Sequence, residues 1–307
     1  MVAVRELLPS LRRWLDAGDD VALAVVVATR RSAPRPVGSA LAVSSGGELV
    51  GSVSGGCVES EVAEEARETL AGGEARLRTY GITDEQALEV GLPCGGEIDV
   101  FVARAERDLL ARAVEALDTG AVVEPELVDG RLRLAVRPPP RLLVFGAVEL
   151  AEALCRGARL LGWRTIVADP RARLATGERV PSADELLVEW PEDALERVGP
   201  DEETAVVVLS HQDRFDVPAL AGALRSSACY VGALGSRRTQ ARRREQLADL
   251  GLAADVLDRI HGPVGLDLGA QTTAEIALAI LAEIVATRRG RSADSLRERG
   301  APIHAEV

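Results

Sequence analysis

Three consecutive prolines, Pro138-Pro139-Pro140, constrain the fold of this 307-residue chain more than any other feature. Proline fixes φ and lacks a backbone N–H, so a proline run cannot continue a helix or a central strand. Such a run forms a stiff, extended connector. The length is also about twice the usual domain length of ~150 residues. We therefore predict one domain over residues 1–137, a second over 138–290, and a charged tail over 291–307.

The two halves differ in the order of their predicted elements. The first half is predicted to be mixed α+β, with strands over 21–29, 40–43, 49–53 and 98–102, helices over 59–70 and 106–117, and a hairpin over 121–136. In the second half, predicted strands over 142–145, 165–168, 205–209 and 229–231 alternate with helices over 149–161, 218–224, 237–250 and 272–287. Strands that alternate with helices of this length indicate a Rossmann-like, doubly wound parallel sheet.

Charge and composition exclude several classes of function. The formal net charge is -12, and an acidic surface repels phosphate backbones, so we predict no nucleic-acid partner. All 36 basic residues are Arg, because the sequence contains no Lys. A Walker-type phosphate loop, a Schiff-base lysine and a lysine general base are thereby excluded.

The sequence predicts a cytoplasmic protein with reduced thiols. No signal peptide is recognisable at the N-terminus. The longest apolar stretch, Val21–Ala28, is far shorter than the roughly 20 residues of a membrane span, so no integral membrane segment is expected. Four cysteines in a long chain of this kind favour free thiols over a disulfide framework.

Two of the cysteines are flanked by glycines and are candidates for the working chemistry. Cys57 ends the motif Gly55-Gly56-Cys57 at the start of a predicted helix, where unpaired backbone N–H groups favour a thiolate. Cys94 begins the motif Cys94-Gly95-Gly96 in a loop before a strand, and glycines let a backbone approach a ligand closely. The two thiols could converge on one ligand or metal, or both could be small residues in tight turns. Cys155 and Cys229 are predicted to be inert core residues.

The second half begins with the layout of a dinucleotide-binding βαβ unit. Gly146 lies at the first turn, and Asp169 follows it at about the 20-residue spacing that places an acid against a ribose hydroxyl. Val148 occupies the position where a second glycine would let the backbone approach a pyrophosphate, and Glu149 adds negative charge beside it. Binding of NAD(P) is therefore doubtful, and a retained scaffold or another ligand is the alternative.

Two further loops follow predicted strands of this sheet, where open α/β sheets bind ligands. His211 lies in the first loop and is either a catalytic acid–base residue or a surface residue. The second loop is Gly235-Ser236-Arg237-Arg238, in which Ser236 is the natural N-cap of the following helix. Two Arg side chains in a first helical turn oppose the helix dipole, so they predict a bound anion there, unless they are simply solvent-exposed.

The motifs together resemble the XdhC/CoxI family. The residues that carry the resemblance are the segments 52–59 (SVSGGCVE), 91–98 (GLPCGGEI), 230–238 (YVGALGSRR) and 260–270 (IHGPVGLDLGA). The resemblance extends from about Val21 to Arg288. Departures from the family pattern are Val148 in the first Rossmann turn, Gln212 beside His211, and Thr273 after the last predicted N-cap.

The resemblance implies a maturation factor, more a non-catalytic cofactor chaperone than an enzyme. Such a factor binds the molybdenum cofactor, a molybdopterin, assists its sulfuration, and delivers it to a molybdenum hydroxylase apo-enzyme of the xanthine dehydrogenase, aldehyde oxidoreductase or carbon monoxide dehydrogenase type. A cysteine desulfurase or sulfurtransferase is the implied second partner, and a homodimer is compatible with this role. Cys57 and Cys94 would hold the metal centre, while glycine-rich backbone and Arg237 or Arg238 would receive phosphate.

Two other functions remain open at this point. An NAD(P)-binding oxidoreductase is suggested by Asp169 and the βαβ layout. A cofactor-free scaffold that docks the enzyme and its sulfur donor would need neither cysteine.

Overall fold

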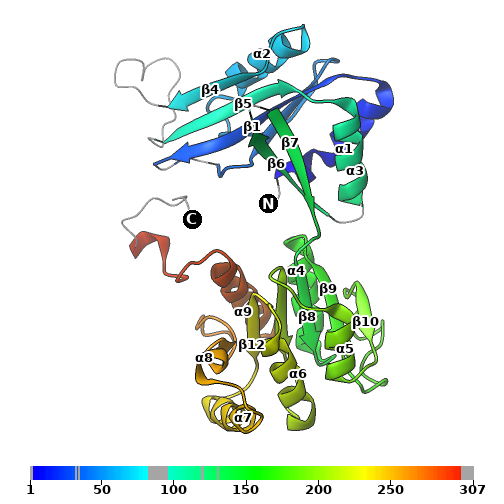
Figure 1. Cartoon of the computed structure of the whole chain (residues 1–307), viewed down its shortest axis with the longest axis vertical. Helices are drawn as coiled ribbons and strands as arrows, with labels where there is room; N and C mark the ends of the chain where they lie inside the picture. Colours follow the sequence, from blue (N-terminus) through cyan, green and yellow to red (C-terminus); the bar gives the residue numbers. More distant parts are fainter. Residues whose placement is uncertain are drawn as a thin grey trace. The chain divides into compact units, whose positions relative to one another are not determined.

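The computed structural model describes residues 3–31, 33, 35–81, 96–118, 121–129 and 131–298. The chain divides into two compact units, one of residues up to Pro138 together with those from Ser295 on, and one of Pro139–Asp294 (Figure 1). Each unit has its own sheet and its own apolar core, so each is described by itself. Cys94 and Gly95 lie outside the described residues.

The first unit contains a five-stranded antiparallel sheet of order β3-β2-β1-β5-β4. Its strands are β1 (Val21–Arg30), β2 (Ala40–Ser44), β3 (Leu49–Gly51), β4 (Arg76–Gly81) and β5 (Glu97–Arg104). Its helices are α1 (Ala3–Ala17), α2 (Glu59–Leu70) and α3 (Arg107–Asp118). The chain then forms a separate two-stranded hairpin of β6 (Val122–Val128) and β7 (Arg131–Arg137).

Strand β1 has a continuous apolar sequence because it is buried on both faces of the sheet. Side chains of a strand alternate between faces. Ala22, Ala24 and Val26 pack with α2 residues in one core cluster, whereas Val21 and Val25 pack with α1 and α3 in another. Figure 1 shows α2 on one side of this sheet and α1 with α3 on the other.

The second unit contains a six-stranded sheet of order β10-β9-β8-β11-β12-β13, in which every pair is parallel. Its strands are β8 (Arg141–Phe145), β9 (Arg164–Ala168), β10 (Glu185–Leu187), β11 (Thr204–Val208), β12 (Tyr230–Ala233) and β13 (Ile260–His261). Its helices are α4 (Glu149–Leu160), α5 (Pro191–Val198), α6 (Asp213–Arg225), α7 (Arg237–Asp249), α8 (Ala254–Leu257) and α9 (Thr273–Arg288). A short 3₁₀ helix, η1, covers Leu296–Glu298.

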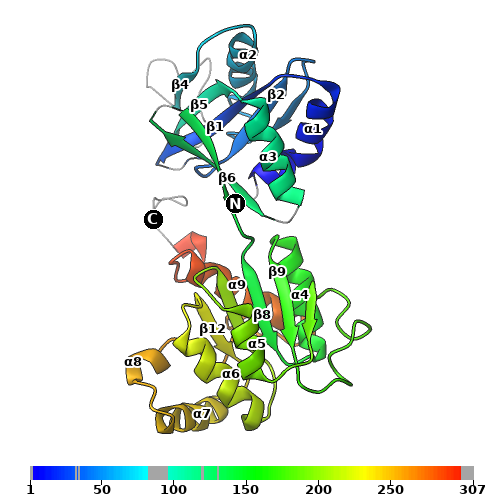
Figure 2. The ribbon, with the colours of Figure 1, turned by 45° about the vertical axis from the view of Figure 1, so that its right-hand side comes forward.

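Helices cover both faces of this second sheet (Figure 2). One core cluster joins the sheet to α4 and α9, and another joins it to α5, α6 and α7. Numbered within the unit, the strand order is 3-2-1-4-5-6, which is the Rossmann order, with the topological switch point between β8 and β11. The predicted doubly wound parallel fold is therefore confirmed.

Several short elements were not predicted from the sequence. They are β4, β10, β13, α5 and α8. Strands β13 and β10 and helix α8 have only two, three and four residues, too few for a hydrophobic period to appear. The predicted Ser236 N-cap is confirmed, and Thr272 and Glu275 form a capping box at the start of α9.

Candidate functional site

The antiparallel topology of the first unit brings the flanks of both glycine-cysteine motifs to one end of its sheet. Gly51 ends β3 opposite Leu41, near the start of β2. Glu97 begins β5 and pairs with Arg30 at the end of β1 and with Gly81 at the end of β4. The Cys57 loop leaves from Gly51, and the segment that contains Cys94 is bounded by Gly81 and Gly96, so both segments start from this end.

One apolar cluster contains residues that flank both segments. Val53 and Val58, which bracket the Cys57 loop, are buried in one core cluster with Tyr80 and Ile98. Tyr80 and Ile98 are paired across β4 and β5, one residue inside the strand ends that flank the segment of Cys94. The predicted convergence of the two cysteines stays a prediction, because Cys94 lies outside the described residues.

Cys57 is an exposed free thiol, two residues before helix α2 begins. Gly55 and Gly56 have φ of 84° and 119°, in the region that favours glycine. A Cβ on either glycine would have no atom within 4 Å, so backbone conformation and not crowding requires them.

The backbone N–H groups of this loop donate to oxygen atoms of nearby side chains. The carboxylate of Glu59 accepts hydrogen bonds from five backbone N–H groups and two hydroxyls, at 2.5 to 3.2 Å. The donors are the N–H groups of Val53, Ser54, Gly55, Gly56 and Val58 and the hydroxyls of Ser52 and Ser54. The N–H of Cys57 itself donates to Ser54 Oγ at 2.9 Å. The N–H groups of residues 53–58 that donate to Glu59 and Ser54 are therefore occupied, and the predicted activation of the thiol stays a prediction.

Glu59 carries its charge far below neutral pH. Burial raises the pKa of this carboxyl, but the hydrogen bonds from Ser52, Ser54 and the loop backbone outweigh burial and lower the pKa to about 2. The loop thus holds a permanent internal anion one residue after Val58. From the sequence, Glu59 was predicted only as the first residue of a helix, although an acid three residues after Gly56 was the available signal.

An ion pair braces the end of the sheet from which these segments leave. Arg30 donates to both carboxylate oxygens of Asp99, at 3.1 and 2.7 Å, and Thr79 Oγ1 donates at 2.7 Å. Burial raises the pKa of Asp99, but these donors outweigh it and hold the pKa below its usual value. The bidentate Arg30–Asp99 pair joins β1 to β5, and the Thr79 hydroxyl joins β4 to the same carboxylate.

In the second unit, the predicted ligand loops gather at the carboxyl edge of the sheet. Gly146 has φ of 110°, and a Cβ there would lie 3.2 Å from the N–H nitrogen of Ser210. The turn after β8 therefore packs directly on the turn after β11, across the switch point. His211, the next residue, is exposed and acts electrostatically on Asp216.

Asp169 is not available to a ribose. Its side chain is only 1% exposed, and Ala147 N donates to its Oδ2 at 2.9 Å. Arg171 supplies three more donors, its N–H and Nε to Oδ1 and its Nη2 to Oδ2, at 2.7 to 2.9 Å. A carboxylate has about four lone-pair sites, and these four donors use them. Burial raises the pKa of Asp169, but the hydrogen bonds from Arg171 and Ala147 lower it overall.

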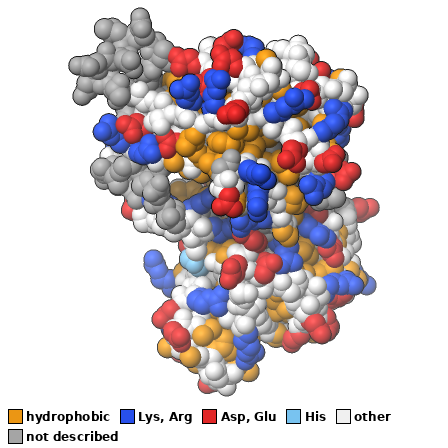
Figure 3. Space-filling model, turned by 45° about the horizontal axis from the view of Figure 1, so that its top comes forward, with side chains coloured by type: hydrophobic (Ala, Val, Ile, Leu, Met, Phe, Trp, Pro, Cys, Tyr) orange, Lys and Arg blue, Asp and Glu red, His pale blue; other side chains and the backbone are white. Residues whose placement is uncertain are grey.

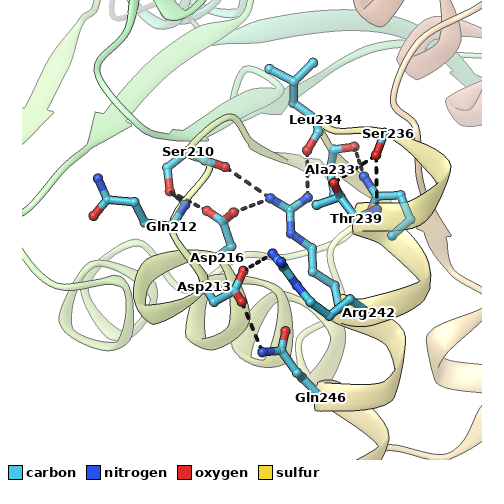
Figure 4. A network of polar contacts seen from close by, with 12 residues as sticks. Ser210, Gln212, Asp213, Asp216, Ala233, Leu234, Ser236, Thr239, Arg242 and Gln246 are labelled. Atoms are coloured by element: carbon cyan, nitrogen blue, oxygen red, sulfur yellow. Dashed lines mark hydrogen bonds and ion pairs between the residues drawn. The ribbon is translucent and has the colours of Figure 1, made fainter.

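A fully buried ion pair connects the turn after β11 with the turn after β12. Arg243 of α7 and Asp216 of α6 are 1% and 0% exposed and form this pair. Arg243 also donates to the backbone oxygens of Leu234, at 2.6 Å, and Ser210, at 3.1 Å, and the Ser210 hydroxyl donates to Asp216. Figure 4 shows Ser210, Asp216 and Leu234 in this network, and Asp213 bound to both Arg242 and Gln246. The two loops are therefore held rigidly together.

The residues of the predicted anion site lie at the start of helix α7. Ser236 Oγ accepts the N–H of Thr239 at 3.2 Å. Gly235 has φ of 141°, and a Cβ there would lie 3.2 Å from Thr239 Cγ2 and 3.3 Å from Arg243 Nη1. Arg237 and Arg238 are exposed in the first turn, which has no acidic residue. Within the described part of the chain neither Arg forms an ion pair, so both guanidinium groups can receive a ligand.

A polar cluster that was not predicted from the sequence lies at the β12–β13 side of the sheet. Glu283 accepts the Tyr230 hydroxyl at 2.5 Å and the N–H of Gly265 at 2.8 Å. His261 stacks on Tyr230, with ring centroids 4.4 Å apart, and its Nδ1 lies 3.4 Å from Glu283 Oε1. The cluster fixes the segment after β13 onto α9. The sequence feature that could have predicted this cluster is His261, which lies in the segment 260–270.

The other two cysteines lie away from these loops. Cys155 is fully buried, and burial raises the pKa of its thiol to about 12 against a weaker hydrogen bond from Thr165. Cys229 is partly buried, and burial raises its thiol pKa as well. Both results agree with an inert role.

Two absences limit the kinds of site in the described residues. These residues contain no group of three or more His, Cys, Asp or Glu side chains arranged to hold a metal ion. Among the same residues, no helix has the length and apolar character needed to cross a membrane. On the surface, acidic and Arg side chains are interspersed over the face shown in Figure 3.

Fold and site together define a protein with a Rossmann unit and a separate antiparallel unit that carries an exposed thiol loop. Residues 142–284 match the XdhC Rossmann domain, and residues 14–81 match the XdhC and CoxI family. The chain belongs to the XdhC/CoxI family.

Named relatives agree with this assignment. The chain is 29% identical over 300 residues to the molybdenum cofactor insertion chaperone PaoD of Escherichia coli K12, covering 92% of this chain and 87% of the relative. It is 26% identical to a protein of Bacillus subtilis 168 named as a probable xanthine dehydrogenase component, covering 90% and 95%. A crystal structure named as a xanthine dehydrogenase from Bacillus halodurans shares the fold, with a TM-score of 0.70, 24% identity and coverage of 94% and 98%.

Proposed function

We propose that this protein is a non-catalytic chaperone for the molybdenum cofactor, which it binds through Cys57 and Cys94 and hands to a molybdenum hydroxylase apo-enzyme. The observation that carries the proposal is the exposed Cys57 thiol, fixed in a rigid loop that starts from the same end of the sheet as the segment of Cys94. A soft thiolate suits a metal centre that favours sulfur. The similarity to a molybdenum cofactor insertion chaperone supports the same function.

The second unit carries a proposed anion site of its own. Arg237 and Arg238 stand at the N-terminus of α7, where backbone N–H groups and guanidinium groups can together receive phosphate. The glycine N–H groups of the Cys57 loop are already bound to Glu59, so we remove Gly55 and Gly56 from the proposed phosphate ligands.

Dinucleotide binding in the Rossmann manner is not part of the proposal. The residue that would bind ribose, Asp169, is buried and saturated by Ala147 and Arg171. Assistance in sulfuration by a cysteine desulfurase or sulfurtransferase remains part of the proposal, because an exposed thiol can also accept or pass on sulfur.

The test is anaerobic incubation of the purified full chain with molybdenum cofactor, followed by desalting and measurement of retained molybdenum and pterin. We expect the wild type to retain cofactor and Cys57→Ala to lose at least about tenfold in affinity, the effect of one ligand worth ~1.4 kcal/mol. The matched control is Ser60→Ala, an exposed position in helix α2 three residues after Cys57, and it should behave as wild type.

Retention of cofactor by Cys57→Ala at the wild-type level would contradict the role of this thiol. Absence of retention by the wild type, together with full activation of the apo-enzyme by a Cys57→Ala/Cys94→Ala variant, would favour the cofactor-free docking scaffold instead.

A further inference from the structure

The loop of residues 52–58 has the geometry of an anion-binding site that the protein fills with its own carboxylate. Successive backbone N–H groups that point into one concavity form a nest, and nests bind anions such as phosphate and carboxylate. Here five N–H groups converge on the side chain of Glu59. Glu59 is half-buried, and its two oxygens are both engaged.

Ser54 connects this internal anion to the cysteine. Its hydroxyl donates to Glu59 Oε2 at 2.5 Å. Ser54 Oγ also accepts the N–H of Cys57 at 2.9 Å and the N–H of Val58 at 3.1 Å. The side chain of Ser54 is buried, whereas Cys57 is exposed. The orientation of the Cys57 backbone therefore depends on Ser54, and the hydroxyl direction of Ser54 depends on the charge of Glu59.

Removal of Glu59 would take the acceptor from the N–H groups of Val53, Ser54 and Gly56. The N–H groups of Gly55 and Val58 also donate to the hydroxyl oxygens of Ser52 and Ser54. Unsatisfied buried N–H groups are costly, and a turn with two positive-φ glycines has little other reason to keep its conformation. The nest would then either open or accept an anion from solution. A glutamine at this position would fill the same space but place an N–H₂ group against the N–H donors.

We propose that Glu59 is the positioning residue of Cys57, an internal anion that closes the oxyanion nest of residues 53–58 and thereby presents the thiol. The loop consequently recognises a ligand through sulfur and not through its backbone N–H groups. That Cys57 is presented to a molybdenum cofactor rests on the proposed function above, whereas the closure of the nest by Glu59 does not.

The experiment measures amide hydrogen exchange of residues 53–58 in the full chain, with the alkylation rate of Cys57 by iodoacetamide read on its own peptide. In Glu59→Ala we expect loop amides to exchange at least about tenfold faster, on the scale of one lost charge-assisted hydrogen bond. Sodium formate or inorganic phosphate should restore protection and the wild-type alkylation rate in a saturable way. Sodium chloride at equal ionic strength should not.

Two variants serve as controls. Glu59→Gln should lose protection like Glu59→Ala but gain nothing from formate, because its side chain occupies the nest. Glu61→Ala removes the other acid of the first turn of α2 and should keep wild-type protection, which separates the nest from the helix dipole.

Unchanged protection in Glu59→Ala, or lost protection that neither formate nor phosphate restores, would overturn the proposal. If Glu59→Ala does not fold, Ser54→Ala decides the matter: it should change the alkylation rate of Cys57, and an unchanged rate is contrary to the proposal. Cofactor retention is a separate readout, so its failure in the wild type would refute the proposed function while the exchange data still test Glu59.

Discussion

Two turns in this molecule follow a strand, precede a helix and depend on an acid, but they expose different chemistry. In the first unit, Glu59 binds the N–H groups of its own loop and leaves the Cys57 thiol exposed. In the second unit, Asp169, directly after the neighbouring strand, accepts the N–H of Ala147, and Arg171 donates to the same carboxylate. One acid presents a reactive group, whereas the other only fixes a turn.

The difference shows that an acid beside a glycine turn does not by itself indicate a ligand site. In the sequence, Asp169 resembles a ligand-binding group and Glu59 the first residue of a helix, yet both carboxylates are saturated from within the protein. What remains free differs: a sulfur in the first unit and two guanidinium groups in the second. The predictions below test this contrast.

The largest effect is expected at the buried ion pair of the second unit. Arg243→Met leaves Asp216 buried without a cation, and breaking a buried pair costs about 3–5 kcal/mol. Urea unfolding of the full chain should show this loss in the transition of the second unit. The double variant Arg243→Met/Asp216→Leu should recover most of the stability, and a double variant as unstable as the single one would refute the pair's role.

A smaller effect is expected at Asp169. Asp169→Asn keeps the shape but removes the charge that Arg171 and Ala147 bind, at a cost of roughly 1–3 kcal/mol in the free energy of unfolding. Because its carboxylate only fixes a turn, cofactor retention should stay at the wild-type level. Loss of retention at unchanged stability would instead give Asp169 a direct role in binding.

Acid should open the Cys57 loop in a defined range of pH. The pKa of Glu59 is lowered in the folded protein from about 4.5 to about 2, so its contribution is fully present above pH 4.5. It is lost as the pH falls from about 4.5 towards 2, because the open loop takes up the proton in this range while the closed loop keeps Glu59 ionised. Hydrogen exchange at residues 53–58 should follow this range in the wild type. Glu59→Gln should show no such dependence there.

The smallest effect on stability is expected for the exposed Arg pair. Arg237→Gln and Arg238→Gln should each leave the free energy of unfolding unchanged or raise it by about 0.3–1 kcal/mol, since a cation opposes the dipole at a helix N-terminus. Binding of inorganic phosphate, measured by calorimetry, should weaken in both. Destabilisation without any change in phosphate binding would remove the proposed anion site.

The sequence predicted long periodic elements well, because each buries a regular apolar face. Helix α2 was predicted with its observed ends, 59–70, and the Rossmann sheet followed from the alternation of strands and helices. Short elements such as β13 were missed because two residues carry no period.

The chemistry of the site was harder to predict, because it depends on partners that sequence spacing does not show. Asp169 was predicted at the correct turn, but its pairing with Arg171 two residues later was missed. Cys57 was singled out and stays a prediction, whereas Glu59, which accepts the N–H groups of the loop, was not singled out. Hydrogen bonds from a loop to its own helix become visible only when the turn conformation is known.

The central claim, that Cys57 contacts the cofactor through sulfur, is tested most directly by molybdenum K-edge X-ray absorption of the cofactor-loaded full chain. The wild type should be compared with Cys57→Ser, which keeps the size of the side chain and replaces sulfur by oxygen. We predict a smaller sulfur shell around molybdenum in Cys57→Ser than in the wild type. An identical sulfur shell in the two loaded proteins would contradict the account.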